Sequence, residues 1–164
     1  MRDGGEPFPF LATRANEHDA RFSPDGRWLA YQSDESGRSE VYVRPFRGAP
    51  AAGGLKWQVS TAGGAEHHWR RDGKELFYLD LDGDLMAAEM TTAGQLAVGP
   101  PAMLFAAPGP RGGPGTTFAA AADGRRFLWK LRPLDAKSDP IEVVVNWLGG
   151  ARQRLEGEAR PRTK

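Results

Sequence analysis

Two short clusters of acidic residues and histidines are the side chains in this sequence best suited to ligand binding. Carboxylates and imidazoles can bind polar groups or metal ions. His67 and His68 are adjacent on an expected strand, so their side chains should point to opposite faces and cannot readily share one ion. The clusters therefore predict a surface for a polar ligand, with ordinary loop solvation as the alternative, and we assign no metal site. The cluster members are Glu17, His18, Asp19, Glu66, His67 and His68.

A third acidic stretch, residues 80–84, has aspartates at alternate positions, as a calcium-binding loop does. An EF-hand loop that starts at Asp80 would need glycine at its sixth position and glutamate at its twelfth. Leu85 and Thr91 stand at those positions. We therefore interpret the stretch as a hairpin turn around Asp82-Gly83.

The sequence lacks the motifs that would indicate catalysis. A G-x-S-x-G nucleophile elbow is absent, and so is a glycine-rich phosphate loop followed by Lys-Ser or Lys-Thr. The serines stand in turn or strand-end contexts, where a hydroxyl commonly bonds nearby backbone. Cysteine is absent too, which excludes thiolate chemistry and disulfides. We expect a chain that is not an enzyme and uses no cofactor.

One short pattern occurs three times and indicates the elements that must position the polar clusters. The copies read F-S-P-D-G-R-W-L-A-Y at 22–31, W-R-R-D-G-K-E-L-F-Y at 69–78 and A-A-A-D-G-R-R-F-L-W at 120–129. Each contains an Asp-Gly pair, and successive pairs lie 47 and 51 residues apart. A repeat of this length with short strands is typical of a radial all-β array. The pairs are Asp25-Gly26, Asp72-Gly73 and Asp123-Gly124.

Each Asp-Gly pair should form a tight turn, because glycine accepts positive φ and the aspartate side chain can bond backbone amides just ahead. In the strand that follows, neighbouring positions are largely apolar, so both faces should be covered, as in a sheet stacked between two others. Large aromatic residues recur in register with the repeat, and we expect them to pack between the sheets. These are Trp28, Tyr31, Trp69, Phe77, Tyr78 and Trp129. Trp57 and Trp147, nearer strand ends, are instead candidates for an interface.

The repeat divides the chain into units separated by loops rich in proline and glycine. Residues 8–13 should form an outer strand left over from a preceding unit, because 56–61 occupies the same place before the second copy. Three units follow at about 18–61, 65–105 and 116–148, flanked by an N-terminal tail at 1–7 and a frayed tail at 149–164. With 21 glycines and 13 prolines, the chain has little room for helices.

The charge and hydropathy patterns argue against two classes of partner. The 22 basic and 21 acidic side chains give a formal charge of +1, which does not indicate a nucleic-acid surface. There is no run of about 18 apolar residues, so we expect no membrane insertion. A hydrophobic content of 40% with 26% charged residues is typical of a globular chain.

Several stretches resemble the TolB-like β-propeller repeats: F-S-P-D-G-R-W-L-A-Y, S-D-E-S-G-R-S-E-V-Y-V-R-P-F, K-W-Q-V-S-T-A-G-G and W-R-R-D-G-K-E-L-F-Y-L-D. The closing I-E-V-V-V-N-W-L-G-G is similar to the end of those propellers. The resemblance implies four-stranded antiparallel blades, with the two polar clusters on the rim of an axial channel.

Such repeats often form the C-terminal sensor or scaffold half of bacterial serine/threonine protein kinases. The resemblance therefore implies a non-catalytic scaffold or sensor module that binds a protein or peptide. The alternative is an accessory propeller domain of a peptidase or other hydrolase, which gates substrate access. A membrane-anchored sensor kinase would place the module in the periplasm or outside the cell, and otherwise it would be cytoplasmic.

The number of repeats predicts a further partner. Closed propellers typically have four to eight blades, whereas this chain supplies about three and the strand at 8–13. The terminal blades would then expose apolar faces. We expect the missing blades to come from a longer parent chain or from a homodimer mate, with an open stack as the third possibility.

Overall fold

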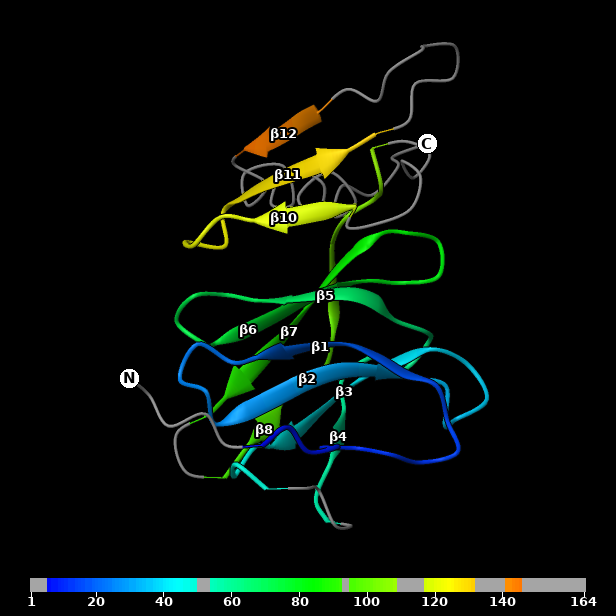
Figure 1. Ribbon diagram of the computed structural model, residues 1–164. Helices are drawn as coiled ribbons and strands as arrows, with labels where there is room; N and C mark the ends of the chain where they lie inside the picture. The colour runs from blue at the N-terminus through cyan, green and yellow to red at the C-terminus, as the bar shows by residue number, and fades with distance from the viewer. Residues whose placement is uncertain (1–5, 50–53, 93–94, 109–116, 132–140, 146–164) are drawn as a thin grey trace, which may run out of the picture.

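The computed structural model describes residues 6–49, 54–92, 95–108, 117–131 and the strand at 141–145. Within these ranges all regular secondary structure is β-strand, and the strands form three antiparallel sheets (Figure 1). The described ranges accordingly contain no helix long and apolar enough to cross a membrane. The all-β prediction is confirmed.

The first two sheets each follow the chain from an inner strand to an outer edge. The first contains β1 (Glu17–Phe22), β2 (Trp28–Ser33), β3 (Glu40–Pro45) and β4 (Trp57–Gln58) in sequence order. The second contains β5 (Ala65–Trp69), β6 (Glu75–Leu79), β7 (Leu85–Thr91), β8 (Ala97–Val98) and β9 (Ala102–Phe105). Strands β8 and β9 both pair with β7. Strand β9 pairs with the first residues of β7 and β8 pairs with its last residues, so two short strands together occupy the outer position of this sheet.

The third sheet contains three strands within the described ranges. They are β10 (Phe118–Ala120), β11 (Arg126–Lys130) and β12 (Ile141–Val145), again antiparallel and in sequence order. The three sheets therefore repeat one topology, in which each Asp-Gly turn joins an inner strand to the next strand of its sheet.

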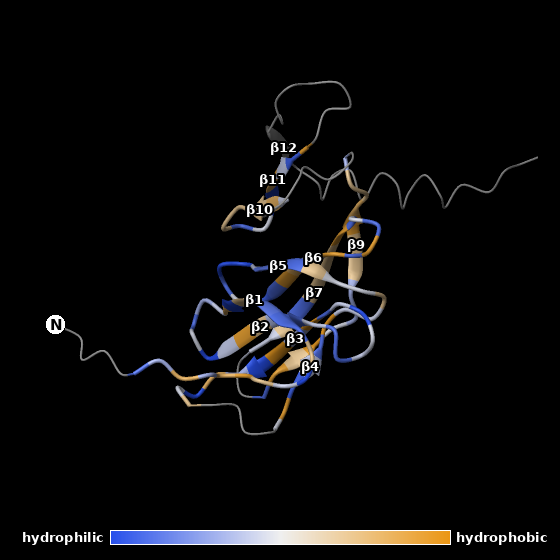
Figure 2. Ribbon diagram, turned by 45° about the vertical axis from the view of Figure 1, so that its right-hand side comes forward, coloured by the Kyte–Doolittle hydropathy of each residue, from blue (hydrophilic) through white to orange (hydrophobic). Residues whose placement is uncertain are grey.

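The sheets pack face to face through two hydrophobic clusters, which we call the first interface (first sheet against second) and the second interface (second against third). Strand β6 supplies both: Leu76 and Tyr78 belong to the first interface, and Phe77 and Leu79 to the second. This alternation follows from the period of two in a strand. It confirms, for the second copy of the repeat, that both faces of the strand after the turn are covered, whereas in β11 Leu128 leaves one face exposed. Figure 2 shows hydrophobic residues along β2, which faces the first interface.

Most of the repeated aromatic residues are buried between the sheets as predicted. Trp28 and Tyr78 lie in the first interface, and Phe77 and Trp129 lie in the second. Trp69 is only partly buried at the edge of the first interface. Trp57 is also partly buried there, with its ring 5.7 Å from that of Trp28.

Tyr31 is the exception among the aromatic predictions. It is buried, but it belongs to neither interface and stacks on Tyr42 at 5.8 Å. The reason is its position in β2: Trp28 and Ala30 face the second sheet, so Tyr31 faces the other way. Trp147 lies outside the described residues.

The outer strand expected at 8–13 is not present. These residues carry no strand and run across the first sheet, where the Phe10 ring lies 5.3 Å from that of Phe46 (Figure 1). Pro7 and Pro9 each lack the N–H that a ladder requires. The expected strand at 56–61 is likewise reduced to Trp57–Gln58. The predicted tails at 1–7 and 149–164 fall wholly or mostly outside the described residues.

The three Asp-Gly turns have the predicted chemistry. Gly26, Gly73 and Gly124 adopt φ values of 70°, 72° and 67°. In each turn the aspartate carboxylate accepts the backbone N–H two residues ahead, at 3.0 to 3.1 Å. A bond from the Ser23 hydroxyl lowers the pKa of Asp25 to about 2, and a bond from Arg70 lowers that of Asp72 to about 2. The carboxylates of these two turns are therefore charged throughout the physiological range.

Candidate functional site

The predicted polar clusters lie at the start of two adjacent inner strands. Strand β5 contacts β1 on one side and β10 on the other, so the inner strands of the three sheets are neighbours (Figure 1). Glu17, His18 and Asp19 open β1, whereas Glu66, His67 and His68 lie in β5. The Asp-Gly turns lie at the opposite end of the same strands. We call the start of β1 and β5 the rim.

The rim carries an irregular backbone at equivalent places in two repeats. The ladder of β1 is interrupted between His18 and Arg21, and that of β5 between Ala65 and His68. Asp19 and Glu66 have φ values of 53° and 47° and are the only non-glycine residues with positive φ in the described ranges. They lie 47 residues apart, which is the interval between the first two Asp-Gly pairs. A bulge of this kind re-aims a side chain, here a carboxylate in both repeats.

The two carboxylates have different partners. Glu66 reaches the third sheet, where it accepts bonds from the backbone N–H of Thr117 and, at 2.6 Å, from its hydroxyl. Thr117 is buried and lies 51 residues after Glu66, at the same place in the third repeat. Asp19 bonds within its own sheet, to Arg21 at 3.3 Å and to Gln32 at 3.2 Å. Glu66 therefore fastens two sheets together, whereas Asp19 remains partly open to solvent.

His67 and His68 point to opposite faces, as predicted, and both rings pack against neighbouring sheets, His67 fully buried and His68 partly buried. His67 is completely buried, close to the Ala30 carbonyl of β2. The His68 ring lies 4.6 Å from that of Phe118 in the third sheet, nearly at right angles. Burial lowers the pKa of each imidazole to about 4, and the positive charge of Arg21 acts in the same direction.

The remaining rim residues are more accessible. His18 is exposed, and Glu17 is partly buried and accepts a bond from the Thr13 hydroxyl. Arg21, which sequence reasoning missed, pairs with Asp19, and their side chains are 34% and 31% exposed. The two residues stand two apart on β1, where alternation places both side chains on one face, so their spacing was the available signal. The β1 half of the rim is therefore its more accessible part.

Metal binding finds no support in the described ranges. No group of three or more histidine, aspartate or glutamate side chains there is arranged to hold an ion. The stretch at 80–84 forms the predicted hairpin turn, with Gly83 at φ 88° and its N–H bonded to the Asp80 carbonyl at 3.2 Å. The Asp84 carboxylate accepts the Ala107 N–H at 2.8 Å. That aspartate therefore anchors the chain after β9.

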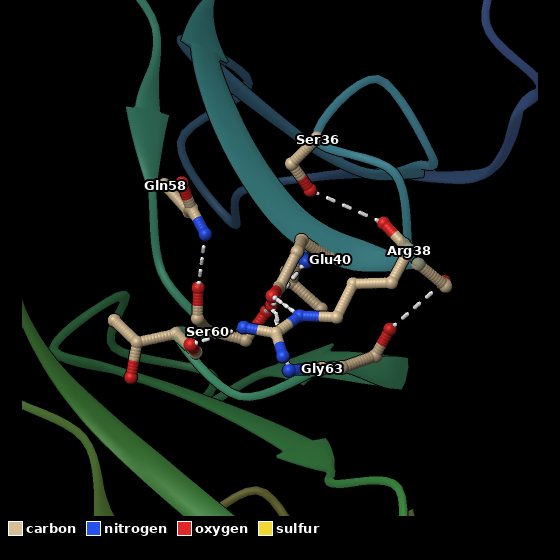
Figure 3. A network of polar contacts seen from close by, with 10 residues as sticks. Ser36, Arg38, Glu40, Gln58, Ser60 and Gly63 are labelled. Carbon is tan, nitrogen blue, oxygen red and sulfur yellow. Dashed lines mark hydrogen bonds and ion pairs between the residues drawn. The ribbon is translucent and has the colours of Figure 1, made fainter.

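Sequence reasoning also missed a buried carboxylate in the first sheet. Glu40 is fully buried and accepts bonds from Arg38 at 2.6 Å, from the Ser60 hydroxyl and from the Gly63 N–H at 3.0 Å (Figure 3). The Ser60 oxygen in turn accepts the Val41 N–H at 2.8 Å. This network joins β3 to the segment that leads into the second sheet. Two features of the sequence could have indicated this network. Glu40 stands directly before the apolar Val41-Tyr42-Val43, and the pair Gly63-Gly64 stands directly before β5.

Comparisons with known proteins support the fold alone. No family model and no curated protein matches the sequence. Among solved structures, the chain resembles oligogalacturonate lyase from Vibrio parahaemolyticus with 17% identity and a TM-score of 0.52, over 78% of this chain and 35% of that one. It also resembles TolB from Acinetobacter baumannii with 15% identity and a TM-score of 0.44, over 88% of this chain and 45% of that one.

The match to oligogalacturonate lyase places the architecture among the β-propellers. The three stacked antiparallel sheets are successive blades of a partial propeller, without a closed barrel. The chain spans less than half the length of either neighbour.

Proposed function

We propose that this chain is a non-catalytic scaffold module that binds a protein or peptide at the β1 half of the rim. The observation that carries the proposal is the pair of equivalent bulges at Asp19 and Glu66. Positive φ at a residue other than glycine costs free energy, and such residues cluster at ligand sites and switch regions. In β5 the bulge aims a carboxylate at the next sheet, whereas in β1 it leaves one partly exposed.

The accessible groups suit a peptide. Carboxylates at Glu17 and Asp19 can accept bonds from backbone N–H groups or cationic side chains. The imidazole of His18 and the guanidinium of Arg21 can donate bonds to carbonyls or carboxylates. Asp19 and Arg21, which lie on one face of β1, can therefore offer an acceptor and a donor to the backbone of an extended peptide.

Peptide selection tests this proposal. A displayed library of random peptides should yield binders to the purified chain. Their affinity for the His18→Ala/Asp19→Asn double variant should fall at least about tenfold, which corresponds to about 1.4 kcal/mol. Asparagine tolerates positive φ, so Asp19→Asn should keep the bulge and remove only the negative charge of the side chain.

The matched control is Arg125→Ala, an exposed side chain in the third Asp-Gly turn at the opposite end of the strands. Its affinity for the same peptides should stay within about twofold of wild type. If the rim double variant binds as tightly as the control, or if no peptide is enriched, the proposal is wrong.

The parent protein is a finer proposal. The sequence resemblance favours the sensor region of a bacterial serine/threonine kinase, and an accessory domain of a peptidase or hydrolase is the alternative. The adjoining coding sequence distinguishes them. A kinase domain upstream supports the sensor, and an α/β-hydrolase domain downstream supports the accessory domain.

We further propose that another blade covers the outer face of the third sheet. Ala119 and Leu128 are exposed on that face, and Leu128 is 41% accessible, whereas Phe127 and Trp129 on the other face are buried. A longer parent chain would supply this blade, or else a homodimer mate. Light scattering should then give either a dimer or a monomer that binds an apolar dye. A compact monomer that binds no dye would contradict both versions.

A further inference from the structure

Strand β5 places one histidine in each of the two interfaces. His67 faces the first sheet, on the same side of the strand as Trp69 and close to the Ala30 carbonyl. His68 faces the third sheet and packs on Phe118. The chain has three histidines, and the third, His18, is exposed on β1. Two of the three are therefore held between blades.

The buried ring nitrogens of these two histidines lack the partners that a charged imidazole would need. Within the described ranges, both ring nitrogens of His67 and the Nε2 of His68 have no hydrogen-bond partner. The Ala30 backbone lies close enough to His67 to raise its pKa slightly against the effect of burial, but it forms no hydrogen bond of good geometry with the ring. An imidazolium has two N–H donors, and burying them without acceptors is costly.

Charged groups of opposite sign face the histidines. From β1, Asp19 favours their protonation and Arg21 opposes it. Asp19 already bonds Arg21 and Gln32, and Glu66 on β5 is bonded to Thr117. The histidines also disfavour each other's charge. The other groups against them are Ala30 of β2, Phe77 of β6 and Phe118 of β10, none of which carries a charge.

We propose that His67 and His68 make the packing between the three blades sensitive to acid, so that mild acidification loosens both interfaces. The inference is independent of the peptide-binding proposal, because it concerns the contacts between sheets and not the exposed half of the rim. Loosening β5 would also release Glu66 from Thr117, the bond that fastens the second sheet to the third.

The direction of the effect follows from linkage. In the unfolded chain each histidine binds a proton near its ordinary pKa of 6.5, whereas in the folded chain its pKa is about 4. Between these values the unfolded state binds more protons, so stability falls as the pH drops. The stability that the folded chain has with both histidines neutral is therefore fully present above about pH 6.5 and is lost progressively toward pH 4. Asp25 and Asp72, whose pKa values are about 2, respond only below this window.

Urea unfolding at pH 7.5, 6.5, 5.5 and 5.0 tests the proposal. Over the acidic part of this range the unfolding constant of the wild type should rise by up to about tenfold per pH unit for each histidine, or up to about a hundredfold for both. His67→Leu and His68→Leu should each reduce this rise in the unfolding constant by up to about tenfold per pH unit. The double variant should show almost no dependence, and His18→Gln, which changes an exposed side chain, should behave as wild type.

Two results would overturn the proposal: a wild type whose unfolding constant does not change over this window, or a double variant that keeps the wild-type slope. If the leucine variants do not fold, imidazole NMR shifts of the wild type replace them. His67 and His68 should remain neutral in the folded protein at pH 5.5. Protonation of either ring in the folded protein at that pH would equally contradict the inference.

Discussion

Replacing Trp129 with alanine should lower the free energy of unfolding by about 3–5 kcal/mol, the range for large aromatic residues in fully packed cores. Trp129 is completely buried in the second interface. Its ring stacks on Phe118 at 5.6 Å and lies 5.8 Å from that of Phe105. Its neighbours come from two sheets, so the cavity could close only if the sheets themselves shifted. Urea denaturation followed by tryptophan fluorescence and circular dichroism would measure the loss.

Two further variants control this prediction. Trp129→Phe should cost much less, because it keeps an aromatic ring and removes an indole N–H that has no partner among the described residues. Trp69→Ala should also cost less than Trp129→Ala. Trp69 is only partly buried, and the hydrogen bond that its indole N–H donates to the Arg21 carbonyl is long at 3.3 Å. A larger loss for Trp69→Ala than for Trp129→Ala would contradict the assignment of the second interface as the better-packed core.

Replacing Glu40 with alanine should destabilise the chain by about 2–5 kcal/mol. The substitution leaves the Ser60 hydroxyl and the Gly63 N–H without an acceptor in a buried position, at about 1–3 kcal/mol each. Arg38 contributes less to the loss, because its side chain is 51% exposed and can turn to solvent. Urea denaturation gives the global loss, and hydrogen exchange at the Gly63 amide should show local loss of protection.

The matched variants are Glu40→Gln and Asp84→Ala. Glutamine keeps one acceptor oxygen, so Glu40→Gln should lie between wild type and Glu40→Ala. Asp84 anchors the segment after the second sheet through the Ala107 N–H, but it is only partly buried. Its removal should therefore cost less than the removal of Glu40. A loss below about 1 kcal/mol for Glu40→Ala would mean that the network in Figure 3 does not hold the first sheet to the second.

The parts of the fold that the sequence predicted are those governed by strict alternation and by turn chemistry. In β6 and β11, neighbouring side chains face opposite sides of a sheet, so Phe77, Tyr78 and Trp129 could be assigned to cores from spacing alone. The Asp-Gly turns were predictable because few other residue pairs accept that backbone. Tyr31 lies on the face of β2 that points away from the second sheet, and spacing alone does not reveal what covers that face.

The candidate site was predictable only in its location. The six rim residues do lie at the start of β1 and β5, but the bulges at Asp19 and Glu66 decide which of them reach solvent. A bulge changes the alternation of side chains without a clear signal in composition. The burial of His67 was not predicted, and the pairing of Asp19 with Arg21 was missed although the two residues stand two apart on one strand.

Strand β6 contributes alternate residues to two different cores, and this limits how the gene can vary. A one-residue insertion or deletion near the start of β6 would turn Leu76 and Tyr78 toward the second interface and Phe77 and Leu79 toward the first. Both cores would be disrupted at once. Tolerated length changes should therefore fall in the connecting loops. The unequal repeat intervals of 47 and 51 residues agree with this, since β2, β6 and β11 differ in length by at most one residue.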